Sequence, residues 1–315
     1  MTVHKTLFER YYNTDEKPRI SEDVTSSHWK EYSDKISVKK TTVNGNEHYD
    51  LIGYGFGENH ASLLSKTFTT ISELVNVNKL KIDGLRTDIN RAKTLIKKMG
   101  LVYSQDAFRQ VCTLNLLKRK MASCKAPERI LIIGDGFGVL SALLHDIYPT
   151  AKIYLIDLGP TLFFQSYYLQ KIFGENAQKL TDTQSGEEAT FNFCTADNPD
   201  ALKDREFELA INIASMQEMD MKIVSNYFSL LRHCKTKAFY CCNRMEKKMP
   251  GGEVSRFMDY PWKTTDVHLI NELCPWHQWY LGYGSARSVK LGGVPVPFVH
   301  LYDGPHWHRF TLLTN

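Results

Sequence analysis

The sequence predicts an α/β protein built on a mainly parallel sheet, and three observations carry that prediction. Strand-like and helix-like runs alternate from Arg129 onward, the order that makes a parallel sheet with helices on both faces. The strand-like runs are apolar nearly throughout, as is typical of strands buried on both sides. The first run, "RILIIG", leads into three glycines and then into a helix. The predicted fold is therefore a Rossmann-like sheet.

The alternating part of the chain supplies five parallel strands and the helices between them. The predicted strands are residues 129–134, 151–157, 189–195, 207–214 and 237–243. The predicted helices are residues 138–148, 160–174 and 219–234. Each strand precedes a helix or a loop that returns the chain to the same edge of the sheet, so the strand ends should meet there.

The end of the chain departs from this rhythm. Residues 297–303 and 308–314, joined by "GPHW", predict a closing β-hairpin instead of another crossover unit. Its last strand would be the seventh of the sheet and antiparallel to the others. Between the fifth strand and this hairpin, residues 244–290 predict an irregular insertion rich in Pro, Gly, Trp and Tyr.

The first 125 residues predict a separate, mainly helical N-terminal domain. Apolar residues recur at helical spacing in 58–80, 83–100 and 104–121, the last with Ser104 as its cap. The "NG" at Asn44-Gly45 suits a hairpin turn among short β-like pieces. Residues 126–315, with the insertion 244–290, would form the catalytic domain.

The length, composition, net charge and cysteine count of the chain restrict the class of protein. At 315 residues, 43% apolar and with a formal net charge of +4, the chain is a globular protein with no sign of a nucleic-acid partner. Seven cysteines, an odd number without a C-x-x-C pair, indicate reduced thiols and a cytoplasmic location. We expect no signal peptide, and no apolar run reaches the length of about 18 residues that spans a membrane.

The glycines after the first strand predict a nucleotide-type cofactor site. Missing Cβ atoms let a ligand approach the backbone, and a helix N-terminus offers free N–H groups. Gly134, Gly136 and Gly138 read G-x-G-x-G, whereas the dinucleotide fingerprint would place its third glycine at Val139. This spacing is similar to the first motif of class I S-adenosylmethionine-dependent methyltransferases.

Two acids follow the next strands. Asp157 ends the second strand, where a carboxylate accepts hydrogen bonds from ribose hydroxyls. Asp197 follows the third strand, where such methyltransferases often carry an acid near the adenine. Nicotinamide-dependent oxidoreductases also place an acid at the first position, so that alternative stays open, as does a non-catalytic nucleotide-binding protein.

Longer runs make the resemblance more specific. "ILIIGDGFGVLSALL", "YLIDLGPTLFFQSYYLQKIF", "NIASMQEM" and "YPW" together resemble the sugar O-methyltransferase family, over about residues 125–315. The resemblance implies S-adenosyl-L-methionine as cofactor and a hydroxyl of a free, nucleotide-linked or glycan sugar as acceptor. The alternative is a methyltransferase of a non-sugar small molecule. The chain has Ile132 where many relatives have an acid, which makes Asp135 the nearest acid for the methionine end. The cofactor-binding positions implied are Gly134, Asp135, Gly136, Gly138, Asp157, Leu158, Asp197 and Ala214.

The acceptor side requires a base, because a sugar hydroxyl is almost wholly protonated at neutral pH. Glu218, after the fourth strand, and His277, in the insertion, are the two candidates. The alternatives are that Glu218 only caps a helix and that His277 is a buried structural histidine. Candidate acceptor-binding residues are Gln217, Tyr260, Trp262 and Trp276; the aromatic ones would equally suit a small core beneath a long loop.

Two further groups of residues bear on the site. The resemblance to methyltransferases implies that the N-terminal domain acts as a lid or a dimerisation surface. Its candidates to reach the acceptor are Arg10, Tyr11, Tyr12 and Trp29. His306 and His308 share one face of a strand near Asp303, a spacing that could bind a divalent metal, but packing in a hairpin explains them better. The sequence thus predicts no metal site.

Overall fold

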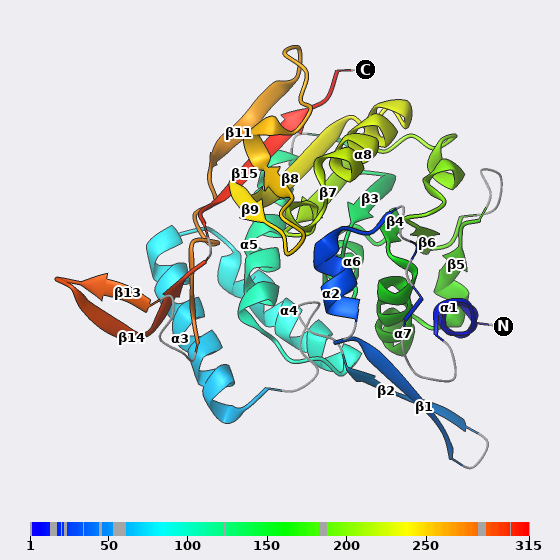
Figure 1. Ribbon diagram of the computed structural model, residues 1–315, viewed down its shortest axis with the longest axis horizontal. Helices are drawn as coiled ribbons and strands as arrows, with labels where there is room; N and C mark the ends of the chain where they lie inside the picture. Colours follow the sequence, from blue (N-terminus) through cyan, green and yellow to red (C-terminus); the bar gives the residue numbers. More distant parts are fainter. Residues whose placement is uncertain are drawn as a thin grey trace.

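The computed structural model describes residues 2–12, 18–19, 21, 24–33, 35–43, 46–52, 61–122, 124–182, 188–282, 288–302 and 304–314. Its centre is a sheet with the strand order β11-β15-β8-β7-β3-β4-β6-β5 (Figure 1). The strands are β3 (Arg129–Ile133), β4 (Lys152–Asp157), β5 (Gln178–Leu180), β6 (Phe191–Thr195), β7 (Leu209–Ile213), β8 (Ala238–Arg244), β11 (Val267–Leu273) and β15 (His306–Leu312).

Six of these strands run parallel, and β15 reverses the direction beside β8. The α/β class, the parallel strands and the antiparallel final strand are therefore confirmed. The described part of the sheet has eight strands and not the expected seven, because the short β5 adds a parallel edge strand next to β6.

Alternate residues of the buried strands serve two separate cores. Ile130 and Ile132 of β3 pack in one hydrophobic cluster, whereas Leu131 and Ile133 pack in the other, as the period of two along a strand requires. The helices that follow the strands are α6 (Val139–Ile147), α7 (Gly159–Phe173) and α8 (Met221–His233). Residues of α6 and α7 belong to the first cluster and residues of α8 to the second, so helices cover both faces.

The N-terminal part contributes to the first of these cores. Leu7, Ile96 and Phe108 belong to the same buried cluster as the sheet residues. Ser104 accepts a hydrogen bond from the backbone N–H of Ala107 and so caps α5 as predicted. The elements are α1 (Val3–Tyr11), α2 (Ser27–Ser33), β1 (Ser37–Val43), β2 (Asn46–Ile52), α3 (Leu63–Leu80), α4 (Leu85–Met99) and α5 (Gln105–Lys120).

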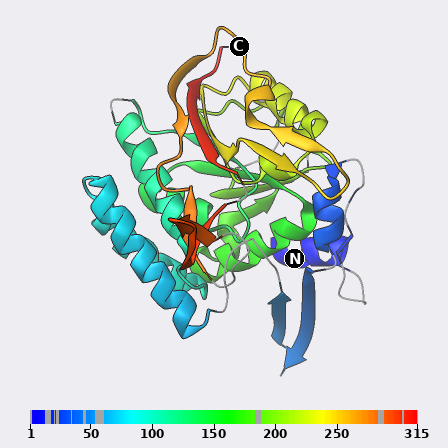
Figure 2. The same ribbon diagram turned by 60° about the vertical axis from the view of Figure 1, so that its left-hand side comes forward.

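The helices lie close to the ranges expected from the sequence, and β1 pairs with β2 as an antiparallel ribbon that projects from the body (Figures 1 and 2). The expected turn residues Asn44 and Gly45, and the "GYGFG" run, lie outside the described residues.

The predicted closing hairpin is wrong. β14 (Val294–Leu301) pairs with β12 (Trp279–Leu281) and β13 (Ser288–Leu291) in a small separate sheet, and β15 pairs instead with β11. The insertion is also less irregular than expected, because it holds β11, β12 and the ribbon of β9 (Glu246–Lys248) and β10 (Val254–Arg256). The partner of a strand is a non-local property, and β11 takes the edge of β15 that a local hairpin would have used.

Two expectations from composition can be compared with the structure. All seven cysteines are free, and Cys124 is the exposed one. Within the described residues, no helix combines the length and the apolar character needed to cross a membrane.

Candidate functional site at the carboxyl ends of the strands

The carboxyl ends of the parallel strands lie along one edge of the sheet, where the connecting loops meet. Open α/β sheets bind their ligands at this edge. The loop after β7 is also contacted by the N-terminal region, since the hydroxyl of Ser26 donates to the backbone carbonyl of Glu218. The site therefore combines loops of the sheet with a segment from the start of the chain.

The glycine loop between β3 and α6 has the backbone that only glycine adopts readily. Gly134, Gly136 and Gly138 have φ of 75°, 60° and 81°, in the left-handed region. A Cβ on Gly134 would lie 2.3 Å from Oγ of Ser215, so this glycine also admits the loop that follows β7. The hydroxyl of Ser215 donates to the carbonyl of Ile133 at 3.0 Å and fixes that approach.

Asp135 faces the helix and not a ligand. Its two carboxylate oxygens accept from the backbone N–H groups of Leu140 (3.0 Å) and Ser141 (2.9 Å) in the first turn of α6, and from the Ser141 hydroxyl. Burial raises its pKa to about 7. The expected contact with the methionine end of a cofactor is not what this geometry favours, because the carboxylate already satisfies the helix terminus.

Asp157 lies at the end of β4, where the sequence predicts a ribose-binding acid. Oδ1 accepts from the backbone N–H of Leu158 at 2.8 Å, and Oδ2 accepts from Nε2 of Gln165 at 2.7 Å. The residue is half-buried, and desolvation raises its pKa to about 7. Two fixed donors hold the carboxylate in one orientation beside the glycine loop. The backbone N–H of Asp135 in that loop also forms a hydrogen bond with this carboxylate, which acts to lower its pKa.

Four residues of the N-terminal region, here called the N-terminal segment, cover this part of the edge: Tyr11, Arg19, Ser21 and Val24. The ring of Tyr11 packs against Gly159, where a Cβ would lie 2.2 Å from the ring. A small cavity of about 10 Å³ remains, with the exposed Asp197 on its rim. It is lined by Tyr11, Arg19, Ser21, Val24, Leu158, Gly159, Pro160, Ala196 and Asp197. Such a volume holds about one water molecule, so an adenosyl group would have to displace the segment.

The other N-terminal candidates are tied into the fold. The hydroxyl of Tyr12 donates to the carbonyl of Pro160 at 3.2 Å, and Arg10 forms a bidentate pair with Asp182 at 3.2 and 3.3 Å. Trp29 packs on the first hydrophobic cluster. These contacts anchor the segment that carries Tyr11.

The loop after β7 is built from backbone contacts to β8. Ala214 has a φ of 59°, unusual for a residue with a Cβ, and its N–H donates to the carbonyl of Cys242 at 2.8 Å. Gln217 is buried, donates its N–H to Oδ1 of Asn243 (3.0 Å) and accepts from the N–H of Arg244 (2.9 Å). Gln217 therefore holds two strand ends together, whereas the sequence had placed it on the acceptor.

Glu218 lies between the ammonium of Lys247 and the imidazole of His28. Its Oε1 is 2.9 Å from Nζ of Lys247 and 3.4 Å from Nε2 of His28. Burial alone would raise its pKa, but the hydrogen bond from His28 and the charge of Lys247 outweigh it, and the pKa is lowered. A carboxylate held so firmly in its ionised form is a weak base and a strong partner for an imidazole.

His277 is packed in the interior. It is 4% exposed, its ring stacks on that of His306 at 3.8 Å, and burial lowers its pKa well below the usual value. Within the described residues, no hydrogen bond or ion pair joins it to Glu218 or to the glycine loop. The structure thus favours the alternative reading of a buried structural histidine.

Of the three candidate sugar-binding aromatics, Tyr260 and Trp276 are buried and Trp262 is half-buried. Tyr260 and Trp262 pack against Phe228 of α8 in the second hydrophobic cluster. Trp276 is 5% exposed and lies edge-on to His308 in the first. The three rings pack in two hydrophobic clusters on opposite faces of the sheet. They therefore do not form a single flat surface for a sugar ring.

Comparison with known proteins gives a likeness of fold. No protein-family model and no curated protein matches the chain. Similar solved structures include a cyclopropane-fatty-acyl-phospholipid synthase-like protein from Lactobacillus casei, with 16% identity over 44% of this chain and 49% of that one, TM-score 0.31. The chain therefore spans about half the length of that protein.

Two further similar structures are named methyltransferases. An rRNA methylase from Escherichia coli has 10% identity over 79% of this chain and 92% of that one, TM-score 0.38. A coclaurine N-methyltransferase bound to N-methylheliamine and S-adenosylhomocysteine has 12% identity over 53% and 50%, TM-score 0.34.

Sequence reasoning missed His28 and Lys247, the two partners of Glu218. The run "SSHWKEYSDK" is consistent with a helix within the N-terminal region. Nothing in it shows that His28 would lie against a residue of the loop after β7, because that contact joins distant parts of the chain. Lys247 follows β8, whose carboxyl end lies at the same edge of the sheet as the glycine loop. Its position after a strand could therefore have predicted that it lies near the site.

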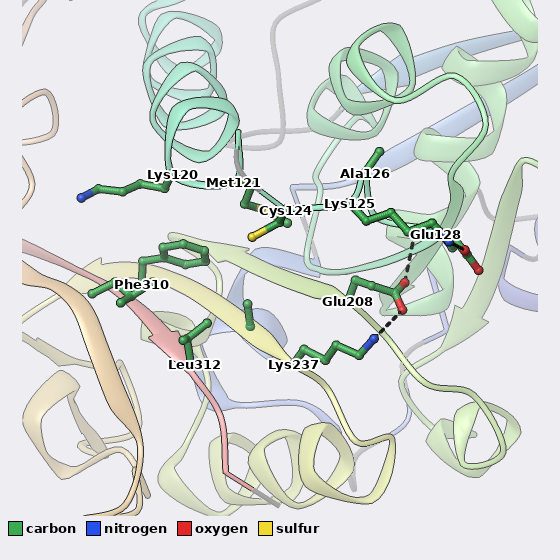
Figure 3. A pocket seen from close by; sticks show the side chains of 12 residues that line it. Lys120, Met121, Cys124, Lys125, Ala126, Glu128, Glu208, Lys237, Phe310 and Leu312 are labelled. Carbon is green, nitrogen blue, oxygen red and sulfur yellow. Dashed lines mark hydrogen bonds and ion pairs between the residues drawn. The ribbon is translucent and has the colours of Figure 1, made fainter.

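A larger cavity, of about 400 Å³, lies at the opposite edge of the sheet (Figure 3). Its walls include Glu128 and Ala238, at the amino ends of β3 and β8, together with Phe310 and Leu312 of β15. Glu208 pairs with Lys237 at 3.3 Å on its rim. Because parallel sheets bind ligands at the carboxyl ends of their strands, this cavity is not the candidate site despite its size.

Proposed function

We propose that the protein is an S-adenosylmethionine-dependent methyltransferase. The observation that carries the proposal is the meeting of the glycine loop and Asp157 at the carboxyl edge of a sheet whose strand β15 reverses beside β8. The reversed strand separates this sheet from the six-stranded dinucleotide fold, and so it argues against a nicotinamide-dependent oxidoreductase. The fit of the cofactor rests on the residues themselves: open glycine backbone and a fixed, half-buried carboxylate.

The cofactor would be held by the glycine loop 134–138, by Asp157 at the ribose hydroxyls and by Asp197 at the adenine. When bound, it supplies an electrophilic methyl group for in-line displacement by a nucleophile. Much of the rate enhancement in such a reaction comes from positioning. Tyr11 and the rest of its segment would close over the cofactor and exclude water, which gives the N-terminal region the role of a lid.

For the acceptor, we infer a hydroxyl group and a histidine base. His28 and Glu218 form the arrangement of an imidazole oriented by a carboxylate. With N–H of Nε2 donated to Glu218, the lone pair of the imidazole is on Nδ1, and this nitrogen would accept the hydroxyl proton as the methyl is transferred. Glu218 would fix the tautomer and stabilise the imidazolium. Lys247 pairs with the same carboxylate oxygen of Glu218 and helps to keep it ionised.

A sugar is the acceptor that the motifs "IDLGPTLFFQSYYL" and "SMQEM" favour. The polar cluster of His28, Glu218 and Lys247 supports a hydroxyl-rich acceptor. The aromatic residues of the insertion give no support, because they lie in the core. A small or glycan acceptor also agrees with the modest net charge of +4, which is low for a nucleic-acid-binding protein of this length.

The test has two stages. Calorimetric titration with S-adenosylmethionine and with NAD decides the cofactor; binding of NAD alone would exclude the proposal. Radiolabelled S-adenosylmethionine is then offered with free sugars, nucleotide sugars, oligosaccharides and total RNA. Transfer to a sugar that survives base treatment, as a methyl ether does, supports sugar O-methylation. Transfer to RNA alone would replace the sugar by a nucleic-acid acceptor.

A further inference from the structure

A buried cluster of two thiols and an imidazole lies beside the acceptor side of the site. Cys242 belongs to β8, and Cys274 and His277 lie in the turn between β11 and β12. Their three ligand atoms all lie within 4.8 Å of one another. The side chains are 1%, 0% and 4% exposed. We propose that these three residues bind a structural zinc ion.

The geometry is close to that of a tetrahedral site. Nδ1 of His277 lies 3.9 Å from Sγ of Cys242. Zinc bonds of about 2.3 Å to sulfur and about 2.0–2.1 Å to nitrogen, at a tetrahedral angle, would place these atoms roughly 3.5 Å apart. For this pair, a contraction of a few tenths of an ångström would reach the distance of two ligands on one zinc ion.

The turn that carries two of the ligands is held in place before any metal binds. The N–H of Cys274 donates to the carbonyl of His306 at 2.9 Å, and the N–H of His277 donates back to the carbonyl of Cys274 at 3.3 Å. The amide of Gln278 donates to both of these carbonyls, at 2.8 and 2.6 Å. This "CPWH" turn therefore directs a thiol and an imidazole toward the thiol of β8 with little freedom to lose on binding.

His306 is a candidate fourth donor that lies outside the group of three ligand atoms, so its ring would have to turn to reach the ion. His306 is 1% exposed, stacks on His277 and has a buried Nδ1 without a hydrogen-bond partner. Buried polar atoms are rarely left so. A Cys₂His₂ set would make a closed structural site, whereas Cys₂His with a water would leave one position open.

The ligand chemistry selects the metal. Thiolate and imidazole together suit zinc, whereas magnesium and calcium require oxygen ligands. Each thiol that binds the ion releases its proton, so two thiolates would neutralise the charge of the divalent cation. The sequence predicts no metal site and indicates reduced thiols at Cys242 and Cys274; a zinc site at these residues would correct the prediction.

The consequence of such an ion would be mechanical. It would join the turn after β11 to β8 one residue before Asn243, which holds Gln217. The carbonyl of Cys242 itself accepts from Ala214. The ion would thus stiffen the loop that carries Glu218 without touching a substrate. The proposal does not depend on the proposed methyl transfer, and metal content can be measured without any activity.

The experiment uses the full chain, purified reduced and without a histidine tag from zinc-supplemented cells. Elemental analysis should find about one zinc per chain, and cobalt substitution should give the intense near-ultraviolet band of thiolate coordination. Cys242→Ser and Cys274→Ser should lose both signals. Cys241→Ser is the matched control, because Cys241 is equally buried on the same strand but faces the other cluster; it should keep both signals.

The outcomes are distinct. His306→Gln that weakens binding marks a closed site, and unchanged binding marks a site of three protein ligands; either result supports the proposal. A wild-type protein that holds no zinc and takes none up from an equimolar solution overturns it. So does a Cys242–Cys274 disulfide in the freshly isolated protein, or equal loss of metal from Cys241→Ser and Cys242→Ser. Circular dichroism of each variant separates loss of a ligand from loss of the fold.

Discussion

The imidazole Nε2 of His28 lies 3.4 Å from the carboxylate Oε1 of Glu218, and this contact joins helix α2 to the loop that follows β7. His28 also packs on the ring of Tyr32, with ring centroids 4.3 Å apart. A histidine fixed on one side by a carboxylate and on the other by an aromatic ring has few orientations left. The N-terminal region therefore supplies the site with a side chain whose position is set by the catalytic sheet.

His28→Gln should lower turnover about 10²–10⁴-fold, the usual scale for loss of a general base. The affinity for S-adenosylhomocysteine should stay the same, because His28 touches neither the glycine loop nor Asp157 among the described contacts. Steady-state kinetics and calorimetry check the two halves. His233→Gln, on the exposed end of α8, serves as control. Equal turnover of the two variants would remove His28 from the reaction.

Glu218→Gln should act as loss of a positioning residue. The amide keeps the shape but removes the charge that orients His28 and pairs with Lys247. We expect kcat to fall while KM for the acceptor changes little, the pattern of an interaction that matters in the transition state. Glu218→Asp, which restores the charge, should recover part of kcat. No difference between the Gln and Asp variants would contradict the assignment.

Asp157→Asn should separate cofactor binding from stability. Oδ1 still accepts from Leu158, and Gln165 can rotate its amide so that Oε1, at present without a hydrogen-bond partner, accepts from the new amide. The ribose hydroxyls, however, lose a charged acceptor worth about 1.5–3 kcal/mol, or roughly 10- to 150-fold in affinity. Calorimetry and thermal unfolding at the same pH test this. Unchanged affinity would show that Asp157 does not meet the ribose.

The raised pKa values of Asp135 and Asp157 predict opposite pH dependences of stability and binding. Burial raises both from the ordinary value of 3.8 to about 7. The folded protein then holds protons that the unfolded chain has released, so the free energy of unfolding falls as pH rises from about 4 to about 7. Cofactor affinity should instead rise with pH over the upper part of that window, because binding requires the ionised Asp157. In Asp157→Asn this rise should vanish; its persistence would assign it to another group.

The sequence predicted what is local and missed what is not. The apolar strand runs and the cap at Ser104 depend on neighbouring residues, and the structure has them within a residue or two. The pairing of β15 with β11 depends on segments far apart in the chain, and the local hairpin rule chose the wrong partner. The aromatic residues illustrate another limit: Tyr260 and Trp262 suit a sugar ring and a core equally well, and the sequence does not show that Tyr260 is buried and Trp262 half-buried.

The same limit applied to the site. Position after a strand was enough to predict that Asp157 and Glu218 lie at the carboxyl ends of the parallel strands, because strand ends converge there. It gave no information on Asp135, whose carboxylate turns back to cap α6. Nor did it show that His28 approaches from a different region of the chain.

The packing of Tyr11 on Gly159 predicts that the N-terminal segment controls the rate of cofactor exchange. The cavity left beneath it, about 10 Å³, is too small for an adenosyl group, so the segment must open before the cofactor enters or leaves. Tyr11→Ala removes the ring that seals the edge and should raise both the association and the dissociation rate constants of S-adenosylhomocysteine in stopped-flow measurements. The equilibrium affinity should change less than either rate, since opening is needed in both directions.

Tyr11→Phe keeps the ring and is the matched control. Gly159→Ala should reproduce the effect of Tyr11→Ala, because its Cβ would lie 2.2 Å from the ring and displace it, while alanine at the first position of α7 favours the helix. If Tyr11→Ala and Tyr11→Phe exchange the ligand at the wild-type rate, the segment is not a lid, and the cofactor enters by another route.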